Sequence, residues 1–411
     1  MLDRVRVRQA IAAGAGILPL EPCWVPRSFM IPGRRLRLHP SDLYAFGGAR
    51  GGINERWFSS TTKASNGPLT TEFEGLSFVH ESVGHKFLLK DAVEIAGDDL
   101  LGSRVMEREG GWNILCKFFD NMGPIPHHLH QSDAFAAKVG QKGKPEAYYF
   151  PPQYNQIDNN FPHTFMGLEP GTTKDDVHRC LEKWNDGDNG ILNHSRAYRL
   201  EVGAGWQIDP GILHAPGSLV TYEPQVNSDV FAMFQSLVEG RVVDWSLMIK
   251  DVPPEHHHDH EYLISMLDWD ANVNPEFAKS NKVFPKPVRP VEQMEAGGYR
   301  ENWVSYGTGW YSAKELTVLP GRTAVIRDGG AYGVAYGVMV TQGCGVFGKH
   351  NISAPTMIRF GQMTEDEFFV TADAAAQGVE IRNSSDSDPL VILKHFGPGN
   401  PDADPLRKRR T

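Results

Sequence analysis

Three histidines lie within four positions of the sequence, at His127, His128 and His130, just after a glycine and two prolines. If this stretch is a β-strand, His128 and His130 point to the same face, because alternate side chains of a strand share a face. His127 then points the opposite way, either as an exposed turn residue or as a hydrogen-bond donor to a substrate. A His-x-His pair alone is weak evidence for a metal site, so the remaining ligands must come from elsewhere in the chain.

Two later segments offer those ligands. Glu146 begins the aromatic strand in "GKPEAYYF", sixteen positions after His130, and His214 lies in "GWQIDPGILHAPGSLV", where prolines and glycines fix the backbone. Three imidazoles and one carboxylate suit a borderline divalent ion, with zinc first and manganese, iron, cobalt or nickel as alternatives. Other coordination positions would be open for water or substrate. The sequence therefore predicts one divalent metal ion bound by His128, His130, Glu146 and His214.

Three further side chains are candidates for proton transfer near that ion. Lys117 lies on the strand before the histidines, Lys144 lies two residues before Glu146, and Glu223 follows the His214 turn. Alternation points both lysines toward a barrel interior, although Lys144 could equally be a solvated loop residue. Glu223 could instead orient a ligand histidine. An aldose–ketose isomerisation requires such groups, because a base must move a proton between C1 and C2 while the enediolate charge is stabilised.

Composition narrows the class of protein. The chain has 411 residues, of which 40% are hydrophobic and 22% charged, as in an ordinary globular protein. The formal net charge of −9 argues against nucleic acid as a partner. No apolar run approaches the roughly 20 residues that span a bilayer, so no membrane partner is expected. Four scattered cysteines without a Cys-x-x-Cys pair favour reduced thiols and a cytoplasmic location.

The elements that must position these side chains are mainly strands. Helical patterns are confined to the N-terminal "RVRVRQAIAAGAGIL", to 172–184 and to 253–269, whereas short strands broken by glycine, proline and asparagine fill most of the rest. The same strand pattern resumes after a proline-rich stretch, which predicts two antiparallel jelly-roll barrels. The predicted units are an N-terminal extension packing on the barrel (1–50), a metal-binding barrel with helical insertions (51–280), a linker (281–299), a second barrel without metal ligands (300–399) and a basic tail (400–411).

Several segments together resemble the type I mannose-6-phosphate isomerases, which are bicupins. The likeness is carried by "ILCKFFDNMGPIPHHLHQ", "GKPEAYYF", "GWQIDPGILHAPGSLVTYEPQVNSD", "ERWFSS" and "TEDEFFVTADAAAQGVEI". The resemblance implies two cupin domains with a helical excursion, and a metal-dependent aldose–ketose isomerase acting through an enediolate on a free or phosphorylated sugar. The ligands of that family, which are Gln, His, Glu and His, fall on His128, His130, Glu146 and His214. A homodimer is left open.

The sequence departs from that family at two positions. His128 replaces the glutamine ligand, and Met233 lies near the place of an arginine thought important for phosphate or for the chemistry. A phosphorylated substrate is therefore doubtful, because phosphate recognition favours a fixed guanidinium. The alternative functions are another cupin metalloenzyme, such as a dioxygenase, and a sugar-binding or regulatory bicupin without turnover.

Two other parts of the sequence contain histidines that could serve as ligands. His256 and His260 lie one helical turn apart in "EHHHDHE", and we interpret this run as the solvated start of an amphipathic helix rather than a second metal site. His350 stands alone in the second barrel, which favours a structural role for that barrel.

Overall fold

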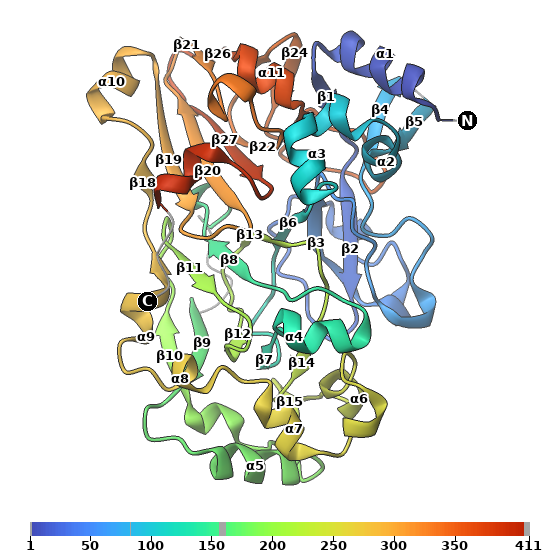
Figure 1. The fold of residues 1–411 in the computed structure, drawn as a ribbon, viewed down its shortest axis with the longest axis vertical. Coiled ribbons are helices and arrows are strands. Elements are labelled where there is room, and N and C mark those ends of the chain that lie inside the picture. The colour runs from blue at the N-terminus through green and yellow to red at the C-terminus, as the bar shows by residue number, and fades with distance from the viewer. Residues whose placement is uncertain (1, 83, 156–161, 407–411) are drawn as a thin grey trace.

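Two antiparallel β-barrels, one above the other in Figure 1, make up most of the molecule. The computed structural model describes residues 2–82, 84–155 and 162–406. Each barrel consists of two sheets with a core between them, so the predicted mainly β, two-cupin architecture is confirmed. No helix in these described ranges is both long and apolar enough to cross a bilayer.

The first barrel, in the lower half of Figure 1, contains the histidine segment. Its larger sheet has the order β17-β11-β8-β13-β6-β3-β2 and its smaller sheet the order β10-β9-β12-β7-β14. The strands are β2 (Cys23–Arg27), β3 (Gly52–Phe58), β6 (Ile114–Phe119), β7 (His128–Leu129), β8 (Glu146–Tyr149), β9 (His163–Leu168), β10 (Ser195–Arg199), β11 (Gly205–Ile208), β12 (His214–Ala215), β13 (Thr221–Val226), β14 (Ala232–Met233) and β17 (Lys282–Val283).

The second barrel consists of a sheet of order β1-β25-β22-β27-β20-β19-β18 and a sheet of order β21-β26-β23-β24. Its strands are β1 (Ile17–Pro19), β18 (Lys286–Pro287), β19 (Tyr299–Ser305), β20 (Ser312–Val318), β21 (Thr323–Ile326), β22 (Tyr336–Gln342), β23 (Cys344–Phe347), β24 (His350–Ser353), β25 (Glu367–Val370), β26 (Val379–Asn383) and β27 (Leu390–Phe396). Alternate residues of these strands, such as Leu316 and Val318, form one apolar core inside the barrel.

Helices cover the ends of the barrels. The predicted helix over 172–184 is α5 (Lys174–Glu182), which begins with a capping box between Thr173 and Asp176. The predicted helix over 253–269 is shorter than expected: a 3₁₀ turn precedes α7 (His260–Ser265), and Asp259 caps its first turn. The remaining α-helices are α1 (Arg4–Gly14), α2 (Leu89–Leu101), α3 (Ser103–Glu109), α4 (Asp133–Ala136), α6 (Trp245–Met248), α8 (Trp269–Asn272), α9 (Phe277–Asn281), α10 (Val291–Ala296) and α11 (Ala372–Gln377).

The N-terminal residues contribute strands to both barrels. β1 pairs with β25 of the second barrel, whereas β2 pairs with β3 at the edge of the larger sheet of the first barrel. The segment predicted as a linker does the same at its start, since β17 pairs with β11 and β18 pairs with β19. Strand pairing therefore crosses the boundaries predicted at residues 50 and 281.

A buried ionic contact joins the two barrels. Arg56 on β3 donates to both carboxylate oxygens of Asp366 at 2.8 Å and to Glu367 at 3.1 Å, and all three side chains are buried. Nearby, the Tyr222 hydroxyl lies 3.0 Å from Nδ1 of His395 on β27. Such a bidentate guanidinium–carboxylate pair fixes the relative orientation of the strands that carry it.

Candidate metal centre and active site

The larger sheet of the first barrel presents charged side chains to the barrel interior. On β6, β8 and β13, alternation places Lys117, Glu146 and Glu223 on the face that lines a common pocket. The antiparallel register sets Glu223 directly opposite Lys117, and their side chains form an ion pair of 3.3 Å. The predicted inward direction of Lys117 is thus explained by strand geometry.

The smaller sheet brings the three predicted histidine ligands together from two strands. β7 and β12 pair with His128 opposite His214, and His130 follows two residues later on the same face. The centroids of the His128 and His214 rings are 4.2 Å apart, and that of His130 lies about 5 Å from each, at 5.0 and 5.1 Å. One ring nitrogen from each residue lies within 4.8 Å of the others, a spacing that could hold a metal ion.

Backbone carbonyls determine which nitrogen of each of the three imidazole rings carries the proton. The Nδ1 atoms of His128, His130 and His214 donate to Pro126, Val230 and Ile212 at 2.8, 2.7 and 2.9 Å. Because a carbonyl oxygen only accepts hydrogen bonds, each Nδ1 carries the proton and each Nε2 of a neutral ring keeps its lone pair. Burial lowers the pKa of His128 well below its usual value, with the neighbouring His214 as the next cause, and this favours the neutral ring.

Glu146 completes a set of donors that fits a divalent cation. Its two carboxylate oxygens lie 3.0 Å from Nε2 of His130 and 3.1 Å from Nε2 of His214. Nε2 of His214 is buried without a hydrogen-bond partner among the described residues, whereas Oε2 of Glu146 has the Lys144 ammonium at 3.1 Å. Acceptor atoms facing one another in a buried site repel unless a cation lies between them, and this donor set suits a borderline divalent ion.

The three candidate proton-transfer residues lie next to this group. The Lys144 ammonium is 3.1 Å from both His130 Nε2 and Glu146, so it is a buried pocket residue and not a solvated loop residue. Glu223 lies between the two lysines, 3.3 Å from Lys117 and 3.9 Å from Lys144. Burial raises the pKa of Glu223 to about 8, helped by the charge of Glu146 and opposed by the two ammonium groups.

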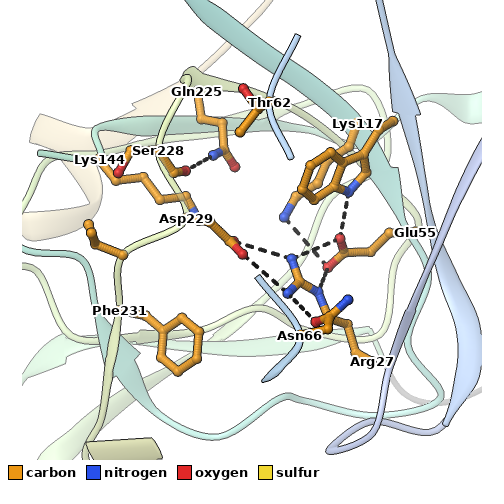
Figure 2. Close-up of polar contacts among 12 residues, drawn as sticks. Arg27, Glu55, Thr62, Asn66, Lys117, Lys144, Gln225, Ser228, Asp229 and Phe231 are labelled. Carbon is orange, nitrogen blue, oxygen red and sulfur yellow. Dashed lines mark hydrogen bonds and ion pairs between the residues drawn. The ribbon is translucent and has the colours of Figure 1, made fainter. Parts of the chain in front are cut away.

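The pocket lined by these residues also contains charged residues that the sequence patterns do not single out. Figure 2 shows the guanidinium of Arg27 lying between the carboxylates of Glu55 and Asp229. Arg27 comes from β2, in the N-terminal segment that the sequence predicts only as an extension packing on the barrel. Its only sequence signal was the strand-like "CWVPR", which does not reveal the partner strand.

Other predicted features have different outcomes. His127 does point away from the pocket, but it is fully buried rather than exposed, because its Nε2 bonds to Ser195 at 2.8 Å. Met233 is buried on β14 opposite His128 and lines the pocket.

The histidine run of the helical region forms local contacts. His256 bonds to Asp259 and stacks on Tyr262 with ring centroids 3.8 Å apart. In the described part of the chain no second group of potential metal ligands is found.

The second barrel holds a buried ionic cluster of another kind. Lys314 and Lys394 point inward from β20 and β27, and their ammonium groups lie 2.6 and 2.8 Å from the two carboxylate oxygens of Asp328. Glu301 on β19 pairs with both lysines. All four side chains are buried. The charge of Asp328 holds the pKa of Lys314 above its ordinary value, although burial alone would lower it.

Comparison with known proteins establishes the fold. No family model and no curated protein matches the sequence. The chain is similar to a solved protein from Archaeoglobus fulgidus that is provisionally assigned as a mannosephosphate isomerase, with 17% identity, a TM-score of 0.60 and coverage of 93% of this chain and 98% of that one. It is also similar to the mannose 6-phosphate isomerase from Bacillus subtilis, with 15% identity, a TM-score of 0.59 and coverage of 93% and 99%.

A third similar structure is a zinc-bound mannose 6-phosphate isomerase, with 12% identity, a TM-score of 0.58 and coverage of 93% of this chain and 100% of that one. The resemblance noted in the sequence is therefore confirmed at the level of the fold. This chain shares the two-cupin architecture of the mannose-6-phosphate isomerases over nearly its whole length.

Proposed function

We propose that this protein is a metal-dependent aldose–ketose isomerase that acts on a sugar through an enediolate. The observation that carries the proposal is the convergence of three histidine Nε2 atoms and the Glu146 carboxylate beside Lys117, Lys144 and Glu223 in one pocket. The fold shared with mannose-6-phosphate isomerases supports it. His128, His130, Glu146 and His214 would hold the ion, and zinc is the first ion to test.

The residues of the chain supply binding, orientation and proton transfer. A divalent ion held by these four side chains supplies, when bound, Lewis acidity toward the carbonyl and hydroxyl oxygens of the sugar. The carboxylate of Glu223 is the proposed group that moves the proton between C1 and C2. Its Oε1 atom is buried in the pocket and makes no hydrogen bond among the described residues, although the Lys117 ammonium is 3.3 Å away.

The two ammonium groups have a separate role in this proposal. Lys117 and Lys144 flank Glu223, and both are almost fully buried. A fixed positive charge in a site that excludes water stabilises developing negative charge more strongly than it would in solution. We therefore assign both lysines to stabilisation of the enediolate charge.

Proton NMR in deuterium oxide tests the proposal. Metal-loaded protein and a His128→Ala control are incubated with a panel of aldoses and their phosphates. We expect deuterium at C2 of at least one sugar with the intact protein and none with the control. Absence of exchange across the panel, with metal occupancy verified, would contradict the proposal; oxygen uptake with a catechol-like substrate would then favour a dioxygenase.

A further inference from the structure

The charged side chains that line the pocket are almost all paired with one another. Among the described residues of the lining there are three cations and four carboxyl groups. The cations are Arg27, Lys117 and Lys144, and the carboxyl groups are those of Glu55, Glu146, Glu223 and Asp229. The protein itself therefore brings no excess of positive charge to the pocket.

The one arginine in this described lining has no free donor. A guanidinium has five N–H donors, and Figure 2 shows those of Arg27 directed at Glu55, Asp229 and Asn66. Nε and one terminal nitrogen bond to Glu55 at 3.1 and 3.3 Å, the two terminal nitrogens bond to Asp229 at 3.2 and 3.3 Å, and the last donor bonds to Asn66 at 2.8 Å. A phosphate group would have to break these bonds to use this side chain.

The lysines are held in the same way. Lys117 lies between Glu55 at 3.6 Å and Glu223 at 3.3 Å, and Lys144 contacts Glu146 at 3.1 Å. Such ammonium groups can still donate to a neutral hydroxyl, while the carboxylates accept from one. A phosphate monoester carries about −1.5 to −2 charges at pH 7, and it would have to compete with these carboxylates for cations that are already paired.

Part of the pocket lining is apolar. It includes Met233 on β14, together with Phe29 and Phe231, which offer no side-chain hydrogen-bond donor. Met233 stands opposite His128, near the place where the resemblance puts an arginine. Apolar side chains in the same lining as a set of paired polar groups suit the C–H and O–H groups of an uncharged sugar.

From this arrangement we propose that the substrate is an unphosphorylated aldose, selected by the mutually paired Arg27–Asp229–Glu55 cluster and the lysines beside it. This inference rests on the proposed function, since the bound sugar is a substrate only if the protein is an isomerase. The selection against phosphate itself rests on binding and can be measured without turnover.

Calorimetric titration of the metal-loaded protein tests the inference. Each aldohexose of a panel that includes mannose is compared with its own 6-phosphate, and inorganic phosphate is the competitor. We expect at least about tenfold tighter binding of one free aldose than of its phosphate, a difference of about 1.4 kcal/mol, and no competition by inorganic phosphate. Equal or tighter binding of the phosphate ester, or no binding of any free aldose, would overturn the inference.

A variant pair sharpens the test. Asp229→Asn removes one carboxylate and weakens the hold on Arg27, so we expect the phosphate ester to gain affinity relative to the free sugar. Asp42→Asn breaks an exposed arginine pair with Arg359, neither of which lines the pocket, and is the matched control. If Asp229→Asn does not fold, the comparison in the wild-type protein still decides. Tight binding of a free aldose without deuterium exchange would support this inference while contradicting the proposed isomerase.

Discussion

The two barrels share one architecture but balance the charges inside them differently. In the first barrel, Glu146 lies beside the Nε2 atoms of His130 and His214, and Nε2 of His214 is buried without a hydrogen-bond partner among the described residues. In the second barrel, Asp328 lies beside the ammonium groups of Lys314 and Lys394 at 2.6 and 2.8 Å. Both interiors contain lysines, but the first also places neutral histidine nitrogens beside a carboxylate, a donor set that suits a cation from solution.

This difference explains why only the first barrel can offer an open site. Lysine donates but cannot act as an acceptor, so the lysine cluster is complete without a ligand. Neutral histidine can donate at one nitrogen and accept a metal at the other. Inward-facing strand positions in a barrel thus give either a closed structural centre or an open site, depending on which residue types occupy them.

The largest difference between the barrels is expected when a histidine of the first barrel is removed. His214→Ala takes away one of three converging nitrogen atoms, so we expect loss of bound metal and a fall in isomerase kcat/KM of at least about 1,000-fold, as several kcal/mol of charge stabilisation disappear. His350→Ala, in the second barrel, is the control. Metal analysis and deuterium exchange measure the effect. Full activity in His214→Ala would show that the first barrel does not depend on this ligand.

Removing a lysine of the second barrel should affect stability instead. Lys394→Ala leaves Glu301 and Asp328 short of a buried cation, and breaking a buried pair in this way typically costs about 3–5 kcal/mol. Urea unfolding of wild-type and variant protein gives the difference in free energy of unfolding. Metal content of the folded variant should be unchanged. A loss of unfolding free energy below about 1 kcal/mol would mean that the lysines are not needed to balance the buried carboxylates of this barrel.

The contact between the barrels should respond to pH. Burial and the neighbouring Asp366 raise the pKa of Glu367 from 4.5 to about 7, against the opposing effect of Arg56. The folded protein therefore holds a proton that the unfolded chain releases, so this group's contribution to stability is complete below pH 4.5 and is lost as the pH rises through 7.

Glu367→Gln removes this dependence. Relative to the variant, wild-type protein should lose up to about 3 kcal/mol between these pH values, since one pKa unit corresponds to about 1.4 kcal/mol. Unfolding free energies measured across this range give the result. Glu365→Gln, at an exposed position two residues away, is the matched control for losing one carboxylate. A constant difference between wild type and Glu367→Gln would contradict the expected titration.

The smallest effect is expected at the histidine run of the helical region. His256 is partly exposed, pairs with Asp259 and stacks on Tyr262. Exposed pairs typically contribute less than about 1 kcal/mol, so His256→Ala should change the unfolding free energy by less than that and leave metal content unchanged. Thermal unfolding with metal analysis checks both. Loss of metal in this variant would reveal a second site and break the contrast between the barrels.

Local periodicity accounts for the part of the site that could be predicted. Strand alternation is enough to place His128 with His130 and to turn Lys117 inward, because these relations depend only on neighbouring residues. It could not reveal Arg27, whose place depends on the pairing of β2 with a strand 25 or more residues away in the sequence. The burial of Lys314 could not be predicted either, because lysine is rarely buried unless it is paired.

The two remaining differences have different causes. His127 was expected as an exposed turn residue or a substrate hydrogen-bond donor, but Ser195, from a strand far along the chain, supplies a buried partner. The helix expected over 253–269 is shortened by a local contact, because Asp259 caps a new first turn within it. Only the first difference depends on a contact outside the sequence pattern that the prediction used.

The first strand of the chain also has a consequence for biosynthesis. β1 is translated long before its partner strand, since Ile17 pairs with Val370, roughly 350 residues later. At about 5–20 residues per second, translation needs tens of seconds to supply that partner. During this time β1 has no sheet to join, while β2, only a few residues further on, can already pair with β3. The barrel that holds the candidate active site can therefore close around Arg27 before the other barrel has been synthesised.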